Sequence, residues 1–116
     1  MMANRHRGEI SAEIDGVERT LCLTLGAIAE LEEAFDAKDI SQLVKLIGST
    51  PLNARQLIAI IGAGLRGGGH NFENADIAEM RFTGGIAGMA LIVSELFDAA
   101  FSGSGTSDGQ SAPNPR

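Results

Sequence analysis

The residues that come closest to a chemical motif are the glycines of the string Gly-Ala-Gly-Leu-Arg-Gly, which runs from Gly62 to Gly67. This spacing satisfies G-x-G-x-x-G, which in a dinucleotide-binding fold follows a strand and opens a helix whose N-terminus holds the pyrophosphate. Here the glycines run on into residues 68–71, Gly-Gly-His-Asn, where we expect no helix, and no second βαβ unit follows. A P-loop also fails, because no Lys-Ser or Lys-Thr comes after the glycines. We therefore predict no nucleotide cofactor.

The simplest interpretation is that these glycines have a structural role only. We expect Gly62 and Gly64 to permit close helix packing, and Gly67–Gly69 to end the helix with left-handed backbone angles. A second interpretation stays open, in which the flexible loop binds a partner protein or, more remotely, a small ligand through the segment Gly62–His70. The residues of this candidate partner-binding loop are Arg66, Gly67, Gly68, Gly69 and His70.

Histidine and cysteine offer no catalytic or metal site. His70 is the only histidine outside the basic N-terminal group Arg5-His6-Arg7, so a two-histidine metal site would need the distant His6. Cys22 is the single cysteine, which excludes an intramolecular disulfide and fits a reducing compartment. It falls in the middle of a predicted strand without a nucleophilic partner, and we interpret it as a small hydrophobe. We predict no enzymatic activity and no metal.

Charge and apolar content limit the partners further. With nine Lys and Arg against fifteen Asp and Glu, the formal net charge is -6, which disfavours direct binding of nucleic acid. We interpret the group at Arg5 as a solvated terminus rather than a phosphate contact. The apolar stretch Gly84–Val93 is ended by Glu95 and Asp98, and is shorter than the ~20 residues that span a membrane. Without a signal peptide at Met1–Gly8, we expect a cytoplasmic protein that binds no membrane.

The element nearest the N-terminus is a predicted β-hairpin over Glu9–Leu25. Its first half alternates apolar and polar residues, and Asp15-Gly16 is a dipeptide that tolerates the positive φ angles of a tight turn. In the second half Leu21, Leu23 and Leu25 fall on one face. A lone hairpin is marginal in water, so we expect this apolar face to rest on helices.

The rest of the chain predicts four or five short helices, marked by apolar residues at helical spacing and by capping residues. They begin after Gly26, at Asp39, at Asn53, at a cap formed by Asn74, and at Ile86, the last helix ending near Phe101. The third, which starts at a capping box between Asn53 and Gln56, is apolar nearly all round and is predicted to be the central helix. The last has an apolar side formed by Met89, Val93, Leu96, Phe97 and Ala100.

The predicted fold is therefore α+β and mostly helical, an N-terminal hairpin followed by four or five short helices. We expect residues 1–8 to be flexible, residues 9–101 to form one globular domain, and residues 102–116 to be a disordered tail, because Ser102–Arg116 is polar and without periodicity. The stretch Glu30–Asp39 carries five acidic residues and one lysine. It reads as a solvated helix face, with an acidic docking surface for a basic partner as the alternative.

Three strings make the sequence resemble a known family. They are Met-Ala-Asn-Arg-His-Arg-Gly-Glu at the N-terminus, Leu-Thr-Leu-Gly-Ala-Ile-Ala-Glu-Leu-Glu at Leu23–Glu32, and Ile-Ala-Ile-Ile-Gly-Ala-Gly-Leu-Arg-Gly-Gly-Gly-His at Ile58–His70. Together they resemble a small protein encoded in the tail-gene region of gene transfer agents and related tailed phages, labelled tail tube protein or tail assembly chaperone. The resemblance covers residues 2–101.

The resemblance implies a non-enzymatic role in building a phage-like tail. As a chaperone-like assembly factor the protein would bind the tape measure protein until tube subunits polymerise around it, and this is our first hypothesis. The alternative is a structural, tube-associated subunit that is retained in the particle. The implied partners are the tape measure protein or other tail proteins, with self-association also open, and the implied locations are the cytoplasm during assembly and the tail of a virion-like particle.

Overall fold

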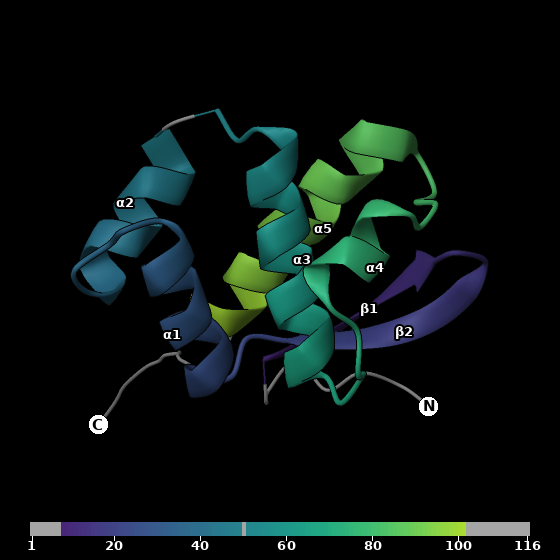
Figure 1. The fold of residues 1–116 in the computed structure, drawn as a ribbon, viewed down its shortest axis with the longest axis horizontal. Helices are drawn as coiled ribbons and strands as arrows, with labels where there is room; N and C mark the ends of the chain where they lie inside the picture. Colours follow the sequence, from purple (N-terminus) through teal and green to yellow (C-terminus); the bar gives the residue numbers. More distant parts are fainter. Residues whose placement is uncertain (1–7, 50, 102–116) are drawn as a thin grey trace, which may run out of the picture.

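The computed structural model describes residues 8–49 and 51–101, so the predictions of a flexible N-terminus and a disordered C-terminal tail concern residues that lie outside it, Gly8 apart. The elements in chain order are β1 (Glu9–Ile14), β2 (Val17–Cys22), α1 (Leu25–Ala34), α2 (Ile40–Ser49), α3 (Ala54–Gly67), α4 (Asn74–Ala78) and α5 (Gly85–Phe101). The predicted class, an α+β chain with a hairpin followed by helices, is confirmed (Figure 1).

Strands β1 and β2 form the predicted antiparallel hairpin around Asp15-Gly16. Both turn residues have positive φ, 59° and 79°, as a two-residue hairpin turn requires, and Ile14 pairs with Val17 across it. The second strand ends earlier than predicted, because the Thr24 hydroxyl accepts a hydrogen bond from the Ala27 amide at 3.1 Å and caps α1. Leu25 is therefore the first residue of α1 and is 79% exposed, where we had expected a strand residue.

Helix α3 is the predicted central helix. Figure 1 shows it in the middle of the molecule, with α1 and α2 on one side, α4 and the hairpin on the other, and α5 passing behind it. It begins at the predicted capping box: the Gln56 amide donates to Asn53 Oδ1 at 2.8 Å, and the Asn53 amide donates to Gln56 Oε1 at 2.9 Å. It packs against β2, α1, α4 and α5, so it organises the core.

The core is aliphatic. Among the described residues no polar or charged side chain is buried. Leu21 from β2, Leu31 from α1, Leu65 from α3 and Leu96 from α5 are each no more than 1% exposed. Burial of apolar area from four different elements is the main favourable term in folding, so these side chains hold the hairpin on the helices.

Glycines let α3 approach its neighbours closely, as predicted for Gly62 and Gly64. A Cβ built on Gly64 would lie 2.6 Å from Leu96 Cδ2, and one on Gly62 would collide with Asn74. The prediction for the end of the helix needs correction. Gly67 is the last helical residue, and of Gly67–Gly69 only Gly69 has a positive φ, 100°. Gly67 and Gly68 instead face the backbone of β2, where a Cβ would overlap carbonyl oxygens.

Two glycines also form the turn that leads into α5. Gly84 and Gly85 both have positive φ, 86° and 62°, which reverses the chain before the helix begins. Helix α4, just before this turn, starts one residue earlier than predicted. Its N-cap is Glu73, whose amide donates to Asp76 Oδ2 at 2.8 Å, and Asn74 is the first helical residue.

Candidate protein-binding surface

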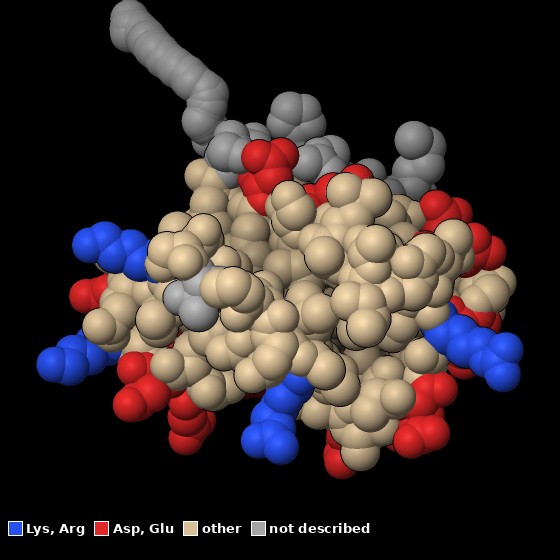
Figure 2. Space-filling model, turned by 90° about the horizontal axis from the view of Figure 1, so that it is seen from above, with Lys and Arg blue, Asp and Glu red and all other residues tan. Residues whose placement is uncertain are grey.

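One face of the molecule carries few charges. Figure 2 looks down on the upper edge of Figure 1, and it shows a broad area of uncharged residues with Lys, Arg, Asp and Glu gathered near its border. The sequence contributes directly, because no charged residue occurs between Arg81 and Glu95. An exposed area of this kind, bordered by charge, is typical of a protein-interaction surface.

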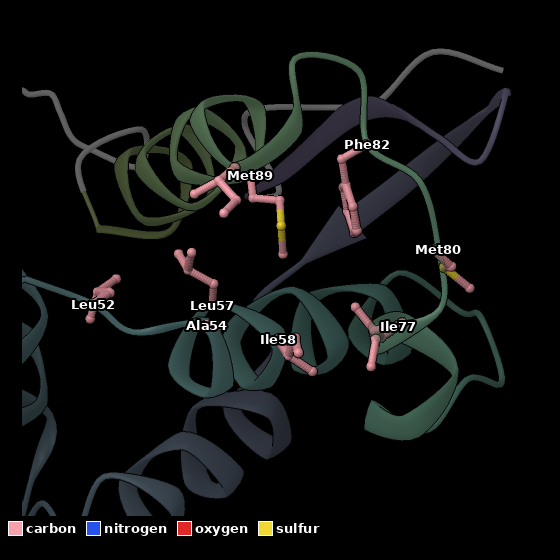
Figure 3. Close-up of a pocket in the computed structure, with 10 residues that line it drawn as sticks. Leu52, Ala54, Leu57, Ile58, Ile77, Met80, Phe82 and Met89 are labelled. Carbon is pink, nitrogen blue, oxygen red and sulfur yellow. The ribbon is translucent and has the colours of Figure 1, made fainter.

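An apolar cavity opens between the start of α3, α4 and the start of α5. Its volume is about 310 Å³, and its lining residues are Leu52, Ala54, Leu57, Ile58, Ile77, Ala78, Met80, Phe82, Ile86 and Met89. In Figure 3 the thioether of Met89 points from α5 toward α3, while Phe82 and Ile77 close the side nearer the hairpin. No lining side chain is charged, so the cavity suits an apolar group.

The cavity-lining residue Phe82 lies in a segment that is hydrogen-bonded to the tip of the hairpin. Phe82 forms an isolated antiparallel bridge with Ile14, and the Asp15 amide donates to the Arg81 carbonyl at 2.6 Å. The Thr83 hydroxyl also donates to Glu13 Oε1 at 3.2 Å. Hydrogen bonds to the hairpin therefore position the segment that carries Phe82, although this segment is neither helix nor strand.

A second hollow lies between α2 and the C-terminal half of α5. It measures about 320 Å³ and is lined by Val44, Ile47, Gly48, Ser94, Phe97, Asp98 and Phe101. Helix α2 packs on α1, and Leu43 is its buried residue, at 0% exposure. Since α2 does not close onto α5, Val44 stays 42% exposed and Phe101 39% exposed.

The two hollows are connected along α5 by a row of outward-facing side chains. We call this row the α5 stripe, and its members are Ile86, Ala90, Ser94, Phe97 and Phe101. Their spacing places them on one face of the helix, whose centre lies about 60° around the helix axis from the buried Val93 and about 120° from the buried Leu96. Ile86 is 72% exposed, and the rings of Phe97 and Phe101 stack at 5.6 Å.

Sequence reasoning identified only part of this surface. It assigned Met89 and Phe97 to the inner side of the last helix, and both are only partly buried. It missed Ile86 and Phe82 as surface residues of the cavity. The available signal was that α5 is apolar on nearly every side in its first half, which is more than one packed face can bury.

Arg66, from the predicted partner-binding loop, is engaged within the chain. Its Nη1 donates to the Phe72 carbonyl at 2.9 Å and to Asn74 Oδ1 at 3.2 Å, and its Nη2 donates to Glu30 Oε1 at 2.7 Å. The side chains of this pair are 28% and 51% exposed, so the ion pair is a surface one. The guanidinium thereby ties α1, the glycine-rich segment and the start of α4 together.

The remaining loop residues differ in their accessibility. Gly67 and Gly68 lie against β2, and the ring of His70 stacks on Phe72 with 5.8 Å between centroids. Phe72 also receives the guanidinium of Arg19, 5.0 Å from its ring centroid. Gly69 is the exposed member of the set, so the accessible part of this loop is small.

Among the residues that the structure describes, no three His, Cys, Asp or Glu side chains come close enough to hold a metal ion, and Cys22 is half-buried. His6 and its basic neighbours fall outside the described residues.

Across 8–49 and 51–101, none of the helices has the length and apolar character needed to cross a membrane. Glycines 62, 64 and 67 all sit within a helix, not in a strand-to-helix turn.

Comparison with known proteins identifies the class. Residues 7–103 match the family described as phage tail tube protein, GTA-gp10, which covers most of the chain. The chain belongs to this family of phage tail proteins, and the resemblance to gene transfer agent and phage tail proteins is confirmed. No curated protein and no solved structure matches the chain.

Proposed function

We propose that this protein is a non-enzymatic structural component of a phage-like tail that is retained in the assembled particle. The observation that carries the proposal is the match to the phage tail tube family over residues 7–103. The family description supports this role better than our first hypothesis of a transient assembly factor. The expected partners are other tail proteins.

The uncharged face provides the contact surface for this role. Because the chain has a net charge of -6, most of its surface repels other acidic proteins, whereas the uncharged area in Figure 2 does not. Ile86 and Phe101 supply exposed apolar area near the two ends of α5. Burial of such area drives most protein association.

A second candidate is a chaperone-like factor that binds the tape measure protein and then leaves. Two observations favour it. Within the described residues the sheet has only two strands, which offers little edge for a ring built by strand pairing between subunits. The cavity contains Met80 and Met89, whose flexible thioethers adapt to varied apolar side chains. The acidic face of α1 would keep such a complex soluble.

The loop Arg66–His70 stays a subsidiary proposal as a partner contact. Its exposed member, Gly69, would offer backbone groups to a partner, while Arg66 would have to exchange its contact with Glu30 for one to the partner. The uncharged face requires no such exchange. We therefore place the principal contact on α5.

Quantitative mass spectrometry of purified particles tests the proposal. Copies of this protein are counted against the main tube subunit, both in particles and in the producing cells. A fixed ratio in mature particles supports a retained tail component. Near-absence from particles, with abundance in cells, overturns it and favours the assembly factor.

A further inference from the structure

We propose that two copies of this chain associate through the α5 stripe, with their α5 helices antiparallel about a two-fold axis near the middle of the helix. A two-fold pair uses the same patch on both copies, so the patch must be complementary to itself. The α5 stripe satisfies this requirement in charge, in shape and in size.

Charge selects this face for self-association. Two copies that each carry a net charge of -6 repel one another, and any contact through the acidic faces of α1 or α4 would bring carboxylates together. The cavity beside Ile86 has no charged lining residue, and the hollow beside Phe101 has one, Asp98. The uncharged face is therefore where like charges oppose association least.

The shape of the stripe matches an antiparallel partner. Its middle residues, Ala90 and Ser94, are small and exposed, which lets two helix backbones approach closely. Its ends are large: Ile86 at one end, Phe97 and Phe101 at the other. Turning the second copy by 180° places its two phenylalanines over the cavity beside Ile86, and its Ile86 over the hollow between α2 and α5.

A carboxylate of α5 decides between the two orientations. Asp98 lies near the C-terminal end of the helix and beside the stripe, whereas Glu95 lies on another side of the helix. In a parallel pair Asp98 would approach its own counterpart, which is unfavourable. In an antiparallel pair Asp98 lies opposite the uncharged stretch around Gly88 of the second copy.

The area around the α5 stripe that a second copy could cover is that of a weak specific interface. Helix α5 has 17 residues and is ~25 Å long, and with its flanking helices the face is ~20–30 Å wide, so each copy would cover about 500–750 Å². Specific interfaces bury about 600–1,000 Å² per partner. We therefore expect dimers that form at micromolar concentrations and dissociate on dilution.

The C-terminal segment of the chain is a poor alternative occupant. Residues Ser102–Arg116 contain no Leu, Ile, Val, Met or Phe, so they offer no large apolar side chain to fill two apolar hollows. A second copy supplies Phe97, Phe101 and Ile86 at the required places.

Sedimentation velocity of the purified full-length chain, over a wide range of concentrations, tests the inference. We expect the mass to rise from 12.1 kDa toward twice that value as concentration increases. Ile86→Glu and Ala90→Glu should each raise the dissociation constant at least about tenfold, because they place a carboxylate in the contact. Both sites are exposed, so we expect both variants to fold, and at Ile86, in the first turn of α5, a carboxylate is also favoured by the helix dipole.

Leu25→Glu is the matched control. Leu25 is 79% exposed on α1, so this variant adds the same charge away from the stripe and should dimerise as the wild type does. Mixing Ala90→Glu with Ala90→Lys should restore association. Residue 90 of each copy lies close to the two-fold axis, so the new carboxylate and the new ammonium group would face each other. A wild-type chain that stays monomeric at every concentration, or stripe variants that dimerise like the control, would overturn the inference. Either result leaves the tail assignment intact, since particle composition is measured separately.

Discussion

Replacing Gly67 with alanine places a methyl group against the backbone of strand β2. Gly67 is the last residue of α3, and a Cβ built there would overlap the carbonyl oxygen of Cys22. A carbonyl in a paired strand cannot rotate away as a side chain can. Either the end of α3 must move from the hairpin, or the strand must bend.

The expected change in the free energy of unfolding is the sum of two opposing contributions. Overpacking a well-packed contact costs about 1–3 kcal/mol, and a backbone obstacle such as Cys22 places Gly67→Ala in the upper part of that range. Alanine recovers up to about 1 kcal/mol because it has a higher helix propensity than glycine. The net expectation is a loss of about 1–2 kcal/mol in the free energy of unfolding, which lowers the Tm by about 5–15 °C for a domain of this size.

Gly48→Ala provides a matched comparison for this prediction. Gly48 lies one residue before the end of α2, and a Cβ there would meet no described atom within 4 Å. The same chemical change should therefore stabilise by up to about 1 kcal/mol. Thermal unfolding followed by circular dichroism measures both variants. If Gly67→Ala raised the Tm as Gly48→Ala does, the close contact between α3 and β2 would be wrong.

Three further predictions test separate parts of the fold. Asn53→Ala removes the capping acceptor of α3 and should cost about 1 kcal/mol of stability, measured by urea unfolding; an unchanged midpoint would mean that the cap contributes nothing. Arg66→Lys keeps the charge but cannot make all of the guanidinium contacts at once. We expect less than about 1 kcal/mol of global destabilisation but faster amide exchange in residues 68–72, and unchanged exchange would contradict the anchoring role. Leu96→Ala should lower the free energy of unfolding by about 2–5 kcal/mol, whereas Leu91→Ala, at a position 60% exposed, should change it by no more than about 0.5 kcal/mol. Similar losses for the two variants would mean that the face of α5 that carries Leu96 is not the one packed in the core.

Most secondary structure could be predicted because its signals are local. The hairpin turn at Asp15-Gly16 and the capping box at Asn53 each depend on a few neighbouring residues, and both are present as predicted. The error at the end of β2 was also local in kind. Leu25 continues the alternation of the strand, but the Thr24 hydroxyl accepts a hydrogen bond from the Ala27 amide, and this caps a helix that begins at Leu25.

The glycine-rich segment shows the limit of local reasoning. Positive φ angles were expected at Gly67–Gly69, and Gly69 alone adopts one. Gly67 and Gly68 are needed for contact with β2, a strand more than forty residues earlier in the chain. The pairing of Arg66 with Glu30 likewise joins distant segments, and nothing in the spacing of either residue indicates the other.

The sequence alone determined the class of fold, the family, and the absence of a recognisable catalytic motif, because turn chemistry, helical periodicity and family-specific strings are written in consecutive residues. Only the tertiary structure decided which apolar residues remain at the surface. Helix α5 is apolar on more sides than one, and the position of α2 and the segment at Phe82 left Ile86 and the two hollows uncovered. A residue's type states that it can be buried, whereas the packing of distant elements determines whether anything covers it.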